Sequence, residues 1–447
     1  MGRLFGTDGI RGIFEQEPMT REMGFKIGSA LVTLCKKRSQ RPTIIIGRDT
    51  RFSGKILEEA VVSGVFSKGG KTILLDVFPT PGLAFMARET NADAGIMISA
   101  SHNPYDYNGF KVLSSEGYKI SDEEESELEE ILFEGRGPVA LDIDLGLTEK
   151  IECAGQRYIS FLKETLWEKH TFEGMKIVLD CANGAAYHVA PDLFTQLGAG
   201  VEALFVNPDG KNINRGCGSQ YPQILSSTVV ETGAHAGLAF DGDGDRLIAV
   251  DEKGGVLTGD QILIICAKML RDRNQLKNNL VISTVMSNMG FQIALGVLGI
   301  NHFAARVGDR YVLEEMKAKG AILGGEDSGH IIFLQHHTTG DGLLTAVQLL
   351  SAMKNAGRPL SQLSTLMSRF PQTLLNVPVR EKPEISSVPE LAMIIGRVEK
   401  ELGGKGRVLV RYSGTEPLCR IMVEGEEKRA IDHYANQIGD VVKKRLG

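Results

Sequence analysis

The chain repeats one order of apolar and polar segments three times. Each copy has an apolar strand, a polar or glycine-rich turn, an amphipathic helix, a second strand and a third short apolar strand. The copies span residues 43–99, 175–243 and 280–330. Because strands that alternate with helices form parallel sheets, the pattern predicts an α/β fold with three similar α/β domains.

Each third strand of the repeat runs directly into a polar loop. The loops are SASHNP (99–104), DGDGDR (241–246) and GGEDSGH (324–330). Ligands of such sheets bind beyond the carboxyl ends of the strands. We therefore expect the three domains to surround one shared cleft, with the three loops facing it.

The domain organisation follows from the same pattern. From about residue 370 the repeat gives way to a shorter unit, which predicts a smaller C-terminal α+β domain. We expect boundaries at 1–153, 154–251, 252–368 and 369–447. The acidic stretch 121–135 predicts an exposed helix whose N-cap is Ser121.

Charge and cysteine content narrow the class of partner. With 50 Lys and Arg against 56 Asp and Glu, the net charge is −6, which excludes the basic footprint of a nucleic-acid-binding protein. The chain has neither an apolar run of the roughly 20 residues that span a bilayer nor an N-terminal signal core. Six scattered cysteines without a CxxC pair fit reduced thiols in the core. We expect a cytoplasmic protein that binds neither nucleic acid nor membrane.

The DGDGDR loop predicts a metal site. Asp241, Asp243 and Asp245 alternate along an extended chain, and their oxygens suit a hard cation such as Mg²⁺ if the intervening glycines let the chain curl. An EF-hand is excluded because Arg246 stands where that loop needs glycine, and because a strand-like segment follows. A polar turn without a ligand is the remaining alternative.

The SASHNP loop carries a candidate nucleophile. Ser101, at the end of a strand, can carry a phosphoryl group if a metal neutralises its charge. The chain lacks a GxSxG elbow, which disfavours hydrolase chemistry. A turn serine beside a structural His102 is the alternative.

The GGEDSGH loop suits a sugar. Glu326 and Ser328 offer hydrogen-bond partners for hydroxyl groups or an amine, and His330 is either a catalytic acid or base or a structural histidine. His336 and His337 have no metal-ligand spacing and are expected at the surface.

Near the C-terminus, RYSGTEPLCR (411–420) has the composition of a phosphate-binding loop, with guanidinium, hydroxyl and backbone donors; a polar turn is the alternative. A GxxxxGK[ST] motif is missing, so a nucleotide held by a P-loop is not indicated. Two N-terminal clusters, 6–12 and 47–54, add three arginines, of which we expect at least one to face the cleft: Arg11, Arg48 and Arg51.

Taken together, FGTDGIRG, SASHNP, DGDGDR, GGEDSGH and RYSGTEP resemble, in this order, the motifs of the α-D-phosphohexomutase superfamily. The resemblance covers essentially the whole chain. Within that superfamily, LFGTDGIRG, DCANGAAY (180–187) and NPDGKNINRGCGS (207–219) are similar to bacterial phosphoglucosamine mutases.

This resemblance implies four domains and an active phosphoserine at Ser101, first phosphorylated by a hexose 1,6-bisphosphate or a kinase. It implies one Mg²⁺ per active site, held by the three aspartates and a phosphate oxygen on Ser101. The resemblance also implies that Lys111 and His330 transfer protons and that Arg11 and Arg246 support the serine and the phosphoryl group. It implies that Glu326 and Ser328 bind the sugar. The phosphate that stays on the sugar during transfer would be bound by Arg411, Ser413, Gly414, Thr415 and Arg420.

The implied reaction interconverts glucosamine 6-phosphate and glucosamine 1-phosphate through a 1,6-bisphosphate, for UDP-N-acetylglucosamine synthesis. A phosphomannomutase/phosphoglucomutase is the alternative, because the stretch 106–111 resembles those enzymes and Asp327 replaces a glutamine typical of the glucosamine group. A non-catalytic sensor would have lost Ser101 or an aspartate. The expected partner is a small phosphosugar, and a homodimer is left open.

Overall fold

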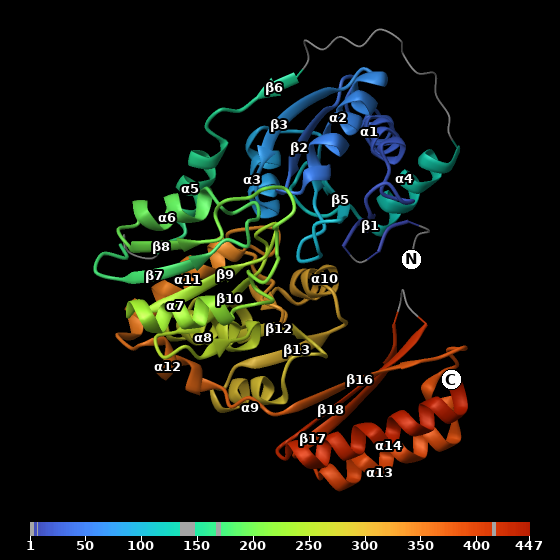
Figure 1. The fold of residues 1–447 in the computed structure, drawn as a ribbon, viewed down its shortest axis with the longest axis vertical. Helices are drawn as coiled ribbons and strands as arrows, with labels where there is room; N and C mark the ends of the chain where they lie inside the picture. The colour runs from blue at the N-terminus through green and yellow to red at the C-terminus, as the bar shows by residue number, and fades with distance from the viewer. Residues whose placement is uncertain (1–3, 7, 135–147, 167–170, 414–416) are drawn as a thin grey trace. The chain divides into compact units, whose positions relative to one another are not determined.

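Four β-sheets organise the computed structural model (Figure 1). The structure describes residues 4–6, 8–134, 148–166, 171–413 and 417–447. These residues form two compact units, the first made of Met1–Met286 and Ile300–Leu366, the second of Ser287–Gly299 and Met367–Gly447. Three α/β sheets lie in the first unit and one antiparallel sheet lies in the second, which confirms the predicted fold class.

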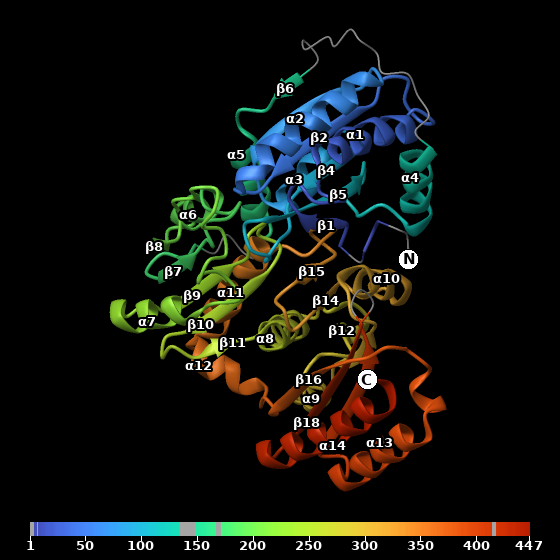
Figure 2. The same ribbon diagram turned by 45° about the vertical axis from the view of Figure 1, so that its right-hand side comes forward.

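The first sheet has the strand order β1-β5-β4-β2-β3-β6. Its apolar strand β2 is buried on both faces: Ile44 and Ile46 pack in the core formed with α1 and α2, and Ile45 lies on the opposite face, towards α3. Figure 2 shows α1 and α2 side by side along the sheet. The strands are β1 (Ile10–Ile13), β2 (Thr43–Arg48), β3 (Lys71–Val77), β4 (Ala94–Ile98), β5 (Tyr107–Ser114) and β6 (Thr148–Lys150), and the helices are α1 (Arg21–Cys35), α2 (Phe52–Ser67), α3 (Thr80–Glu89) and α4 (Asp122–Glu134).

Helix α4 is the acidic helix that the sequence predicted. The Ser121 hydroxyl accepts from the Glu124 amide at 3.2 Å, and the Glu124 carboxylate accepts from the Ser121 amide at 3.1 Å, so Ser121 caps the helix as expected.

The second sheet has the order β11-β10-β9-β7-β8. Strands β7, β8 and β9 are parallel, and β10 returns antiparallel to β9. The strands are β7 (Lys176–Asp180), β8 (Gly200–Leu204), β9 (Ala236–Phe240), β10 (Leu247–Asp251) and β11 (Val256–Leu257), and the helices are α5 (Ala154–Glu164), α6 (Val189–Gln196) and α7 (Gln223–Thr232).

The third sheet has the order β13-β12-β14-β15. The buried helices α8 and α11 pack against each other beside it. The strands are β12 (Leu280–Thr284), β13 (Asn301–Ala305), β14 (Leu323–Gly325) and β15 (Ile331–Phe333), and the helices of the first unit here are α8 (Gly259–Asp272), α10 (Asp309–Lys319), α11 (Gly342–Ala356) and α12 (Leu360–Leu363).

The three α/β sheets are mixed rather than wholly parallel. In each, the polar loop joins the third strand of the repeat to an antiparallel fourth strand: β4 to β5, β9 to β10, and β14 to β15. The reason is length, because a short loop can join only antiparallel neighbours, whereas a parallel pair needs a crossover of a dozen residues or more. The three polar loops are therefore hairpin connections at equivalent places.

The second unit contains the predicted C-terminal α+β structure. Its antiparallel sheet has the order β16-β18-β17, and two helices cover one apolar core with it. Helix α9 of the third repeat also belongs to this unit. The elements are α9 (Met289–Val297), β16 (Gln372–Pro378), α13 (Pro389–Leu402), β17 (Gly406–Tyr412), β18 (Leu418–Gly425) and α14 (Lys428–Leu446).

Burial differs from the prediction at His337 and agrees with it for most of the cysteines. His337 is buried, not at the surface, because its ring hydrogen-bonds the Pro81 carbonyl at 2.9 Å and packs edge-on against Phe161. Five of the six cysteines are buried as expected, and Cys153 is exposed. In the described parts of the chain, every helix is too short or too polar to cross a membrane.

Close packing of α1 against α2 generates a testable prediction. A Cβ at Gly64 would overlap the carbonyl oxygen of Phe25, so Gly64→Ala is expected to lower the free energy of unfolding by about 1–3 kcal/mol. Gly155→Ala is the control, since its Cβ would meet its nearest neighbour, Val189, at 3.9 Å. Urea unfolding measures both, and equal stability of the two variants would contradict the packing described.

Candidate active site

Ser101 lies in the hairpin loop after β4 with a backbone φ of 50°, which non-glycine residues rarely adopt. Two side chains hold its carbonyl oxygen: buried Arg51 donates to it at 3.0 Å and Asn214 at 2.8 Å. The Ser101 hydroxyl donates to Asp241 Oδ2 at 2.5 Å and lies 3.3 Å from His102 Nδ1. The fold therefore directs this hydroxyl into the carboxylate loop of the second sheet.

The carboxylates of Asp241, Asp243 and Asp245 converge as the sequence predicted. Each offers one oxygen, and these oxygens lie within 4.8 Å of one another. The loop curls at its glycines: Gly244 has a φ of 75°, and a side chain at Gly242 would overlap the Ser101 carbonyl oxygen. The three aspartates are 0%, 0% and 4% exposed, so their charge needs compensation.

Lys111 supplies part of that compensation from β5. Its ammonium group lies 2.7 Å from Asp243 Oδ2 and 3.1 Å from Asp245 Oδ2. Burial raises the pKa of Asp245, but Lys111, His330 and Arg246 together outweigh burial and hold that pKa well below the usual range. Burial and the two other aspartates raise the pKa of Asp241, which Lys111 does not contact, well above its usual range.

The donor set of the loop fits a divalent cation. Within the described residues, Asp243 Oδ1 and Asp245 Oδ1 are buried without a hydrogen-bond partner. Carboxylate oxygens are the ligands that Mg²⁺ prefers, and three buried aspartates beside one lysine leave negative charge to be neutralised. The loop can therefore hold a metal ion beside Ser101.

His330, from the β14–β15 hairpin, reaches the same place. Its Nδ1 lies 3.7 Å from Asp245 Oδ2 and its Nε2 lies 3.6 Å from Asp309 Oδ2. Burial lowers its pKa, but Asp245 and the neighbouring acids outweigh burial and raise the pKa of His330 to about 9. In the neutral ring, Nε2 accepts from the Gly340 amide at 3.2 Å and the proton lies on Nδ1, facing Asp245, whereas the protonated ring presents an N–H group to each of Asp245 and Asp309.

The other residues of this hairpin differ in accessibility. The Ser328 side chain is exposed, whereas Glu326 is held by the Gly308 amide at 3.1 Å, and burial raises its pKa. Asp327 accepts a weak 3.5 Å hydrogen bond from the Asp260 amide at the start of α8. Ser328 and Glu326 thus offer polar groups near His330, and Asp327 bonds to a helix of its own domain.

The predicted arginines separate into two groups. Arg11 bonds Asn103 of the serine loop at 3.1 Å, and the Arg246 side chain lies 3.8 Å from Asp245, so both belong to the site. Arg51 holds the serine loop by donating to the carbonyl oxygens of Ser101 and Asn103. Arg48 pairs with Glu58 at 2.9 Å instead.

Three further charged residues join the site. Lys119 bonds both Asp8 and Asp309, and Asp8 also bonds Arg11 and lies 3.4 Å from Lys111. The sequence analysis missed them because Lys119 and Asp309 belong to no dense motif of acids or glycines, and because only the arginine of the N-terminal motif was singled out. Asp8 lies inside the FGTDGIRG motif, and Asp309 follows the second strand of the third repeat, so their positions offered a weak signal.

The C-terminal loop assembles part of its predicted set within the second unit. Arg411 of β17 is paired with Arg420 of β18, and burial together with Arg420 lowers the pKa of Arg411. Arg420 donates to the Ser413 hydroxyl at 3.4 Å, and Lys382, which the sequence analysis missed, donates to the Ser413 carbonyl at 2.7 Å. Gly414 and Thr415 lie outside the described residues. This concentration of cations suits a phosphate group.

Family models match the chain along almost its whole length. They describe the phosphoglucomutase/phosphomannomutase α/β/α domain I at residues 2–137, domain II at 156–255, domain III at 258–370 and the C-terminal domain at 374–441.

Curated relatives match over full length. A phosphoglucosamine mutase from Syntrophus aciditrophicus is 54% identical and one from Bacillus subtilis 48% identical, each over 100% of both chains.

Solved structures share the fold. A phosphoglucomutase/phosphomannomutase family protein from Burkholderia thailandensis has a TM-score of 0.81 at 23% identity, covering 99% of this chain and 98% of its own. The N-acetylphosphoglucosamine mutase from Aspergillus fumigatus has a TM-score of 0.68 at 15% identity, covering 99% and 96%. The chain therefore belongs to the phosphoglucomutase/phosphomannomutase family, within the α-D-phosphohexomutase superfamily.

Proposed function

We propose that the protein is a phosphoglucosamine mutase, which interconverts glucosamine 6-phosphate and glucosamine 1-phosphate by phosphoryl transfer through Ser101. The observation that carries this proposal is the Ser101 hydroxyl, 2.5 Å from Asp241 in a buried carboxylate triad. The choice of an amino sugar rests on the full-length relatives of that name, at 54% and 48% identity.

The proposed cofactor is one Mg²⁺, held by Asp241, Asp243 and Asp245 together with a phosphate oxygen on Ser101. Bound there, it would neutralise charge on the transferring phosphoryl group, which carries roughly −1.5 to −2 as a serine phosphate. The two partnerless carboxylate oxygens of the triad support this assignment.

In the proposed transfer, a sugar hydroxyl forms a bond to the phosphorus on Ser101 while the phosphorus–Oγ bond breaks. The hydroxyl proton passes to a protein base, and a protein acid returns a proton to Oγ. The product is a sugar 1,6-bisphosphate, whose other phosphate then returns to Ser101 by the same steps in reverse. Because one phosphate leaves and one arrives, the cycle is an isomerisation that consumes neither water nor nucleotide.

Lys111 and His330 are the proposed proton carriers. Both contact Asp245, and both are buried, which excludes competing exchange with solvent. Arg11, bonded to Asn103, and Arg246 would stabilise the phosphoryl charge. Glu326 and the exposed Ser328 would hold the sugar.

Positions that depart from the glucosamine group do not point towards a different substrate. In the stretch 106–111, which resembles the phosphomannomutase/phosphoglucomutase group, Phe110 is fully buried in the core of the first sheet, because neighbours of Lys111 along β5 face away from it. Asp327 bonds the start of α8. Both departures therefore act within their own domains, which supports the amino-sugar assignment over a phosphomannomutase/phosphoglucomutase.

The substrate assignment is tested by ³¹P NMR with Mg²⁺ and a trace of hexose 1,6-bisphosphate. We expect kcat/KM for glucosamine 1-phosphate to exceed that for mannose 1-phosphate and glucose 1-phosphate by at least about 10-fold, since enzymes discriminate by differential transition-state binding. Preference for mannose or glucose would establish the alternative mutase instead. No turnover of any of the three would leave a binding protein.

Loss of the nucleophile gives a second prediction. Ser101→Ala is expected to lower kcat by more than about 10³-fold, since the hydroxyl that bonds Asp241 and carries the phosphoryl group in the proposed transfer is lost. Mass spectrometry of the purified wild type should find phosphate on Ser101. Ser63→Ala, an exposed hydroxyl on α2, is the control and should retain full activity. Substantial turnover by Ser101→Ala would refute the phosphoserine.

The proposed metal site gives a further testable prediction. Chelation of the wild type is expected to abolish turnover, and added Mg²⁺ to restore it, whereas Asp245→Asn should bind Mg²⁺ at least about 10-fold more weakly because a charged ligand is lost. Isothermal titration with Mg²⁺ measures the affinity. Asp76→Asn is the control: its φ of 57° suits asparagine and it lies outside the triad. Unchanged affinity in Asp245→Asn would remove it from the metal site.

A further inference from the structure

Six ionisable side chains in and beside the candidate active site form a closed ring of contacts, with carboxylates alternating with nitrogen-bearing groups. Two members, Lys111 and His330, are the proposed proton carriers, and Asp245 lies between them. The other half of the ring is Asp8, Lys119 and Asp309. In order, the contacts are Asp245–Lys111 at 3.1 Å, Lys111–Asp8 at 3.4 Å, Asp8–Lys119, Lys119–Asp309 at 2.5 Å, Asp309–His330 at 3.6 Å and His330–Asp245 at 3.7 Å.

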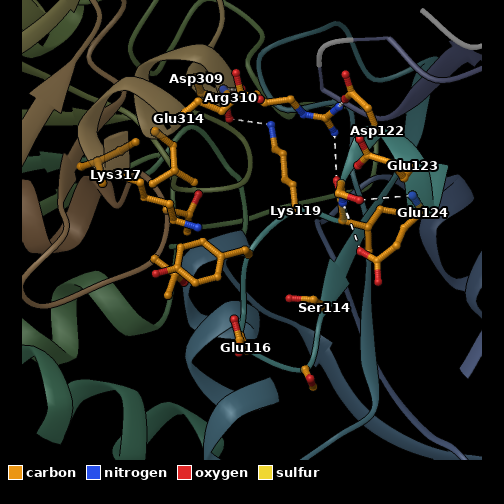
Figure 3. Close-up of a pocket in the computed structure, with 18 of the residues that line it drawn as sticks. Ser114, Glu116, Lys119, Asp122, Glu123, Glu124, Asp309, Arg310, Glu314 and Lys317 are labelled. Atoms are coloured by element: carbon orange, nitrogen blue, oxygen red, sulfur yellow. Dashed lines mark hydrogen bonds and ion pairs between the residues drawn. The ribbon is translucent and has the colours of Figure 1, made fainter. Parts of the chain in front are cut away.

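Lys119 closes this ring from outside the reaction centre. It follows β5 in the turn 114–121 and reaches Asp309 at the start of α10, as Figure 3 shows. Both side chains line a pocket of about 500 Å³, yet they are only 15% and 14% exposed. His330 lines the same pocket, whereas Ser101 and the metal-binding aspartates do not. Lys119 contacts the centre through its two carboxylate partners.

Both carboxylates have further partners. Asp8 also bonds Arg11 and lies 3.4 Å from Lys111, whereas Asp309 lies 3.6 Å from His330 Nε2 and accepts from the Arg310 amide at 2.8 Å. Without the Lys119 charge, each of these mostly buried carboxylates would lose one cationic partner, which is costly unless the remaining partners move closer. Lys111 would then be drawn towards Asp8, and the His330 ring towards Asp309, both away from Asp245.

We propose that Lys119 is a positioning residue, which holds Lys111 and His330 at Asp245 by neutralising Asp8 and Asp309. This inference rests on the proposed mutase function. It assigns no contact with substrate to Lys119, so the residue should act on the rate of transfer and not on sugar binding.

A purely mechanical role is the competing explanation, since the same turn also docks the first domain on the third. Other hydrogen bonds hold the turn against the third domain, and none of them involves a side chain of the ring. The Arg310 guanidinium donates to the Ile120 carbonyl at 3.2 Å and to Glu125 at 3.0 Å, and the Thr338 hydroxyl donates to the Gly117 carbonyl at 2.7 Å. Arg310 thus provides a matched control for docking alone.

The test compares Lys119→Met, Lys119→Arg and Arg310→Met with the wild type, using glucosamine 1-phosphate. We expect Lys119→Met to lose about 10- to 100-fold in kcat, as small misplacements of catalytic groups do, with KM changed by less than about threefold. Lys119→Arg keeps the charge and should recover much of that loss. Arg310→Met should keep kcat within about threefold of the wild type, even where its unfolding midpoint falls.

Three outcomes would overturn the inference: a wild-type kcat in Lys119→Met, an equal loss in Lys119→Met and Arg310→Met, or a loss confined to KM. Should Lys119→Met fail to fold, Asp309→Asn removes the carboxylate charge between Lys119 and His330. This variant should lower kcat in the same range. Failure of the proposed function is separate, because it would appear as a wild type that turns over no phosphosugar.

Discussion

The burial of three carboxylates in one short loop is the constraint on which the rest of the active site depends. Asp241 and Asp243 are fully buried and Asp245 nearly so. Desolvated like charges a few ångströms apart are tolerated only when cations neutralise them. Lys111 bonds two of the three, and the third accepts a hydrogen bond from the Ser101 hydroxyl. The remaining negative charge is what makes the loop suitable for a divalent cation beside that hydroxyl.

The repeated architecture explains why these groups meet. In each α/β sheet the third strand ends in a hairpin loop, and the three loops supply the serine, the aspartates and His330. The serine itself sits in a left-handed conformation that costs on the order of 1–3 kcal/mol, which Arg51 and Asn214 offset by holding its carbonyl oxygen. The scaffold thus fixes the hydroxyl before any substrate is bound.

The domains differ in what they contribute. The second domain provides the carboxylates, whereas the first and third provide the groups that balance and orient them, with Lys119 and Asp309 connecting those two domains. Positions such as Phe110 and Asp327, which differ from the glucosamine group, bond or pack within their own domains.

Local patterns predicted the strands, the acidic helix capped by Ser121, and the polar loops that carry Ser101 and the three aspartates, because spacing within a few residues decides which side chains share a face or a turn. Tertiary structure alone decided that His337 is buried, that Arg51 rather than Arg48 supports the serine, and that Asp8, Lys119 and Asp309 join Lys111 and His330. Those three residues lie more than a hundred positions apart. Their interaction depends on how separate domains pack, and no short-range pattern in the chain encodes that packing.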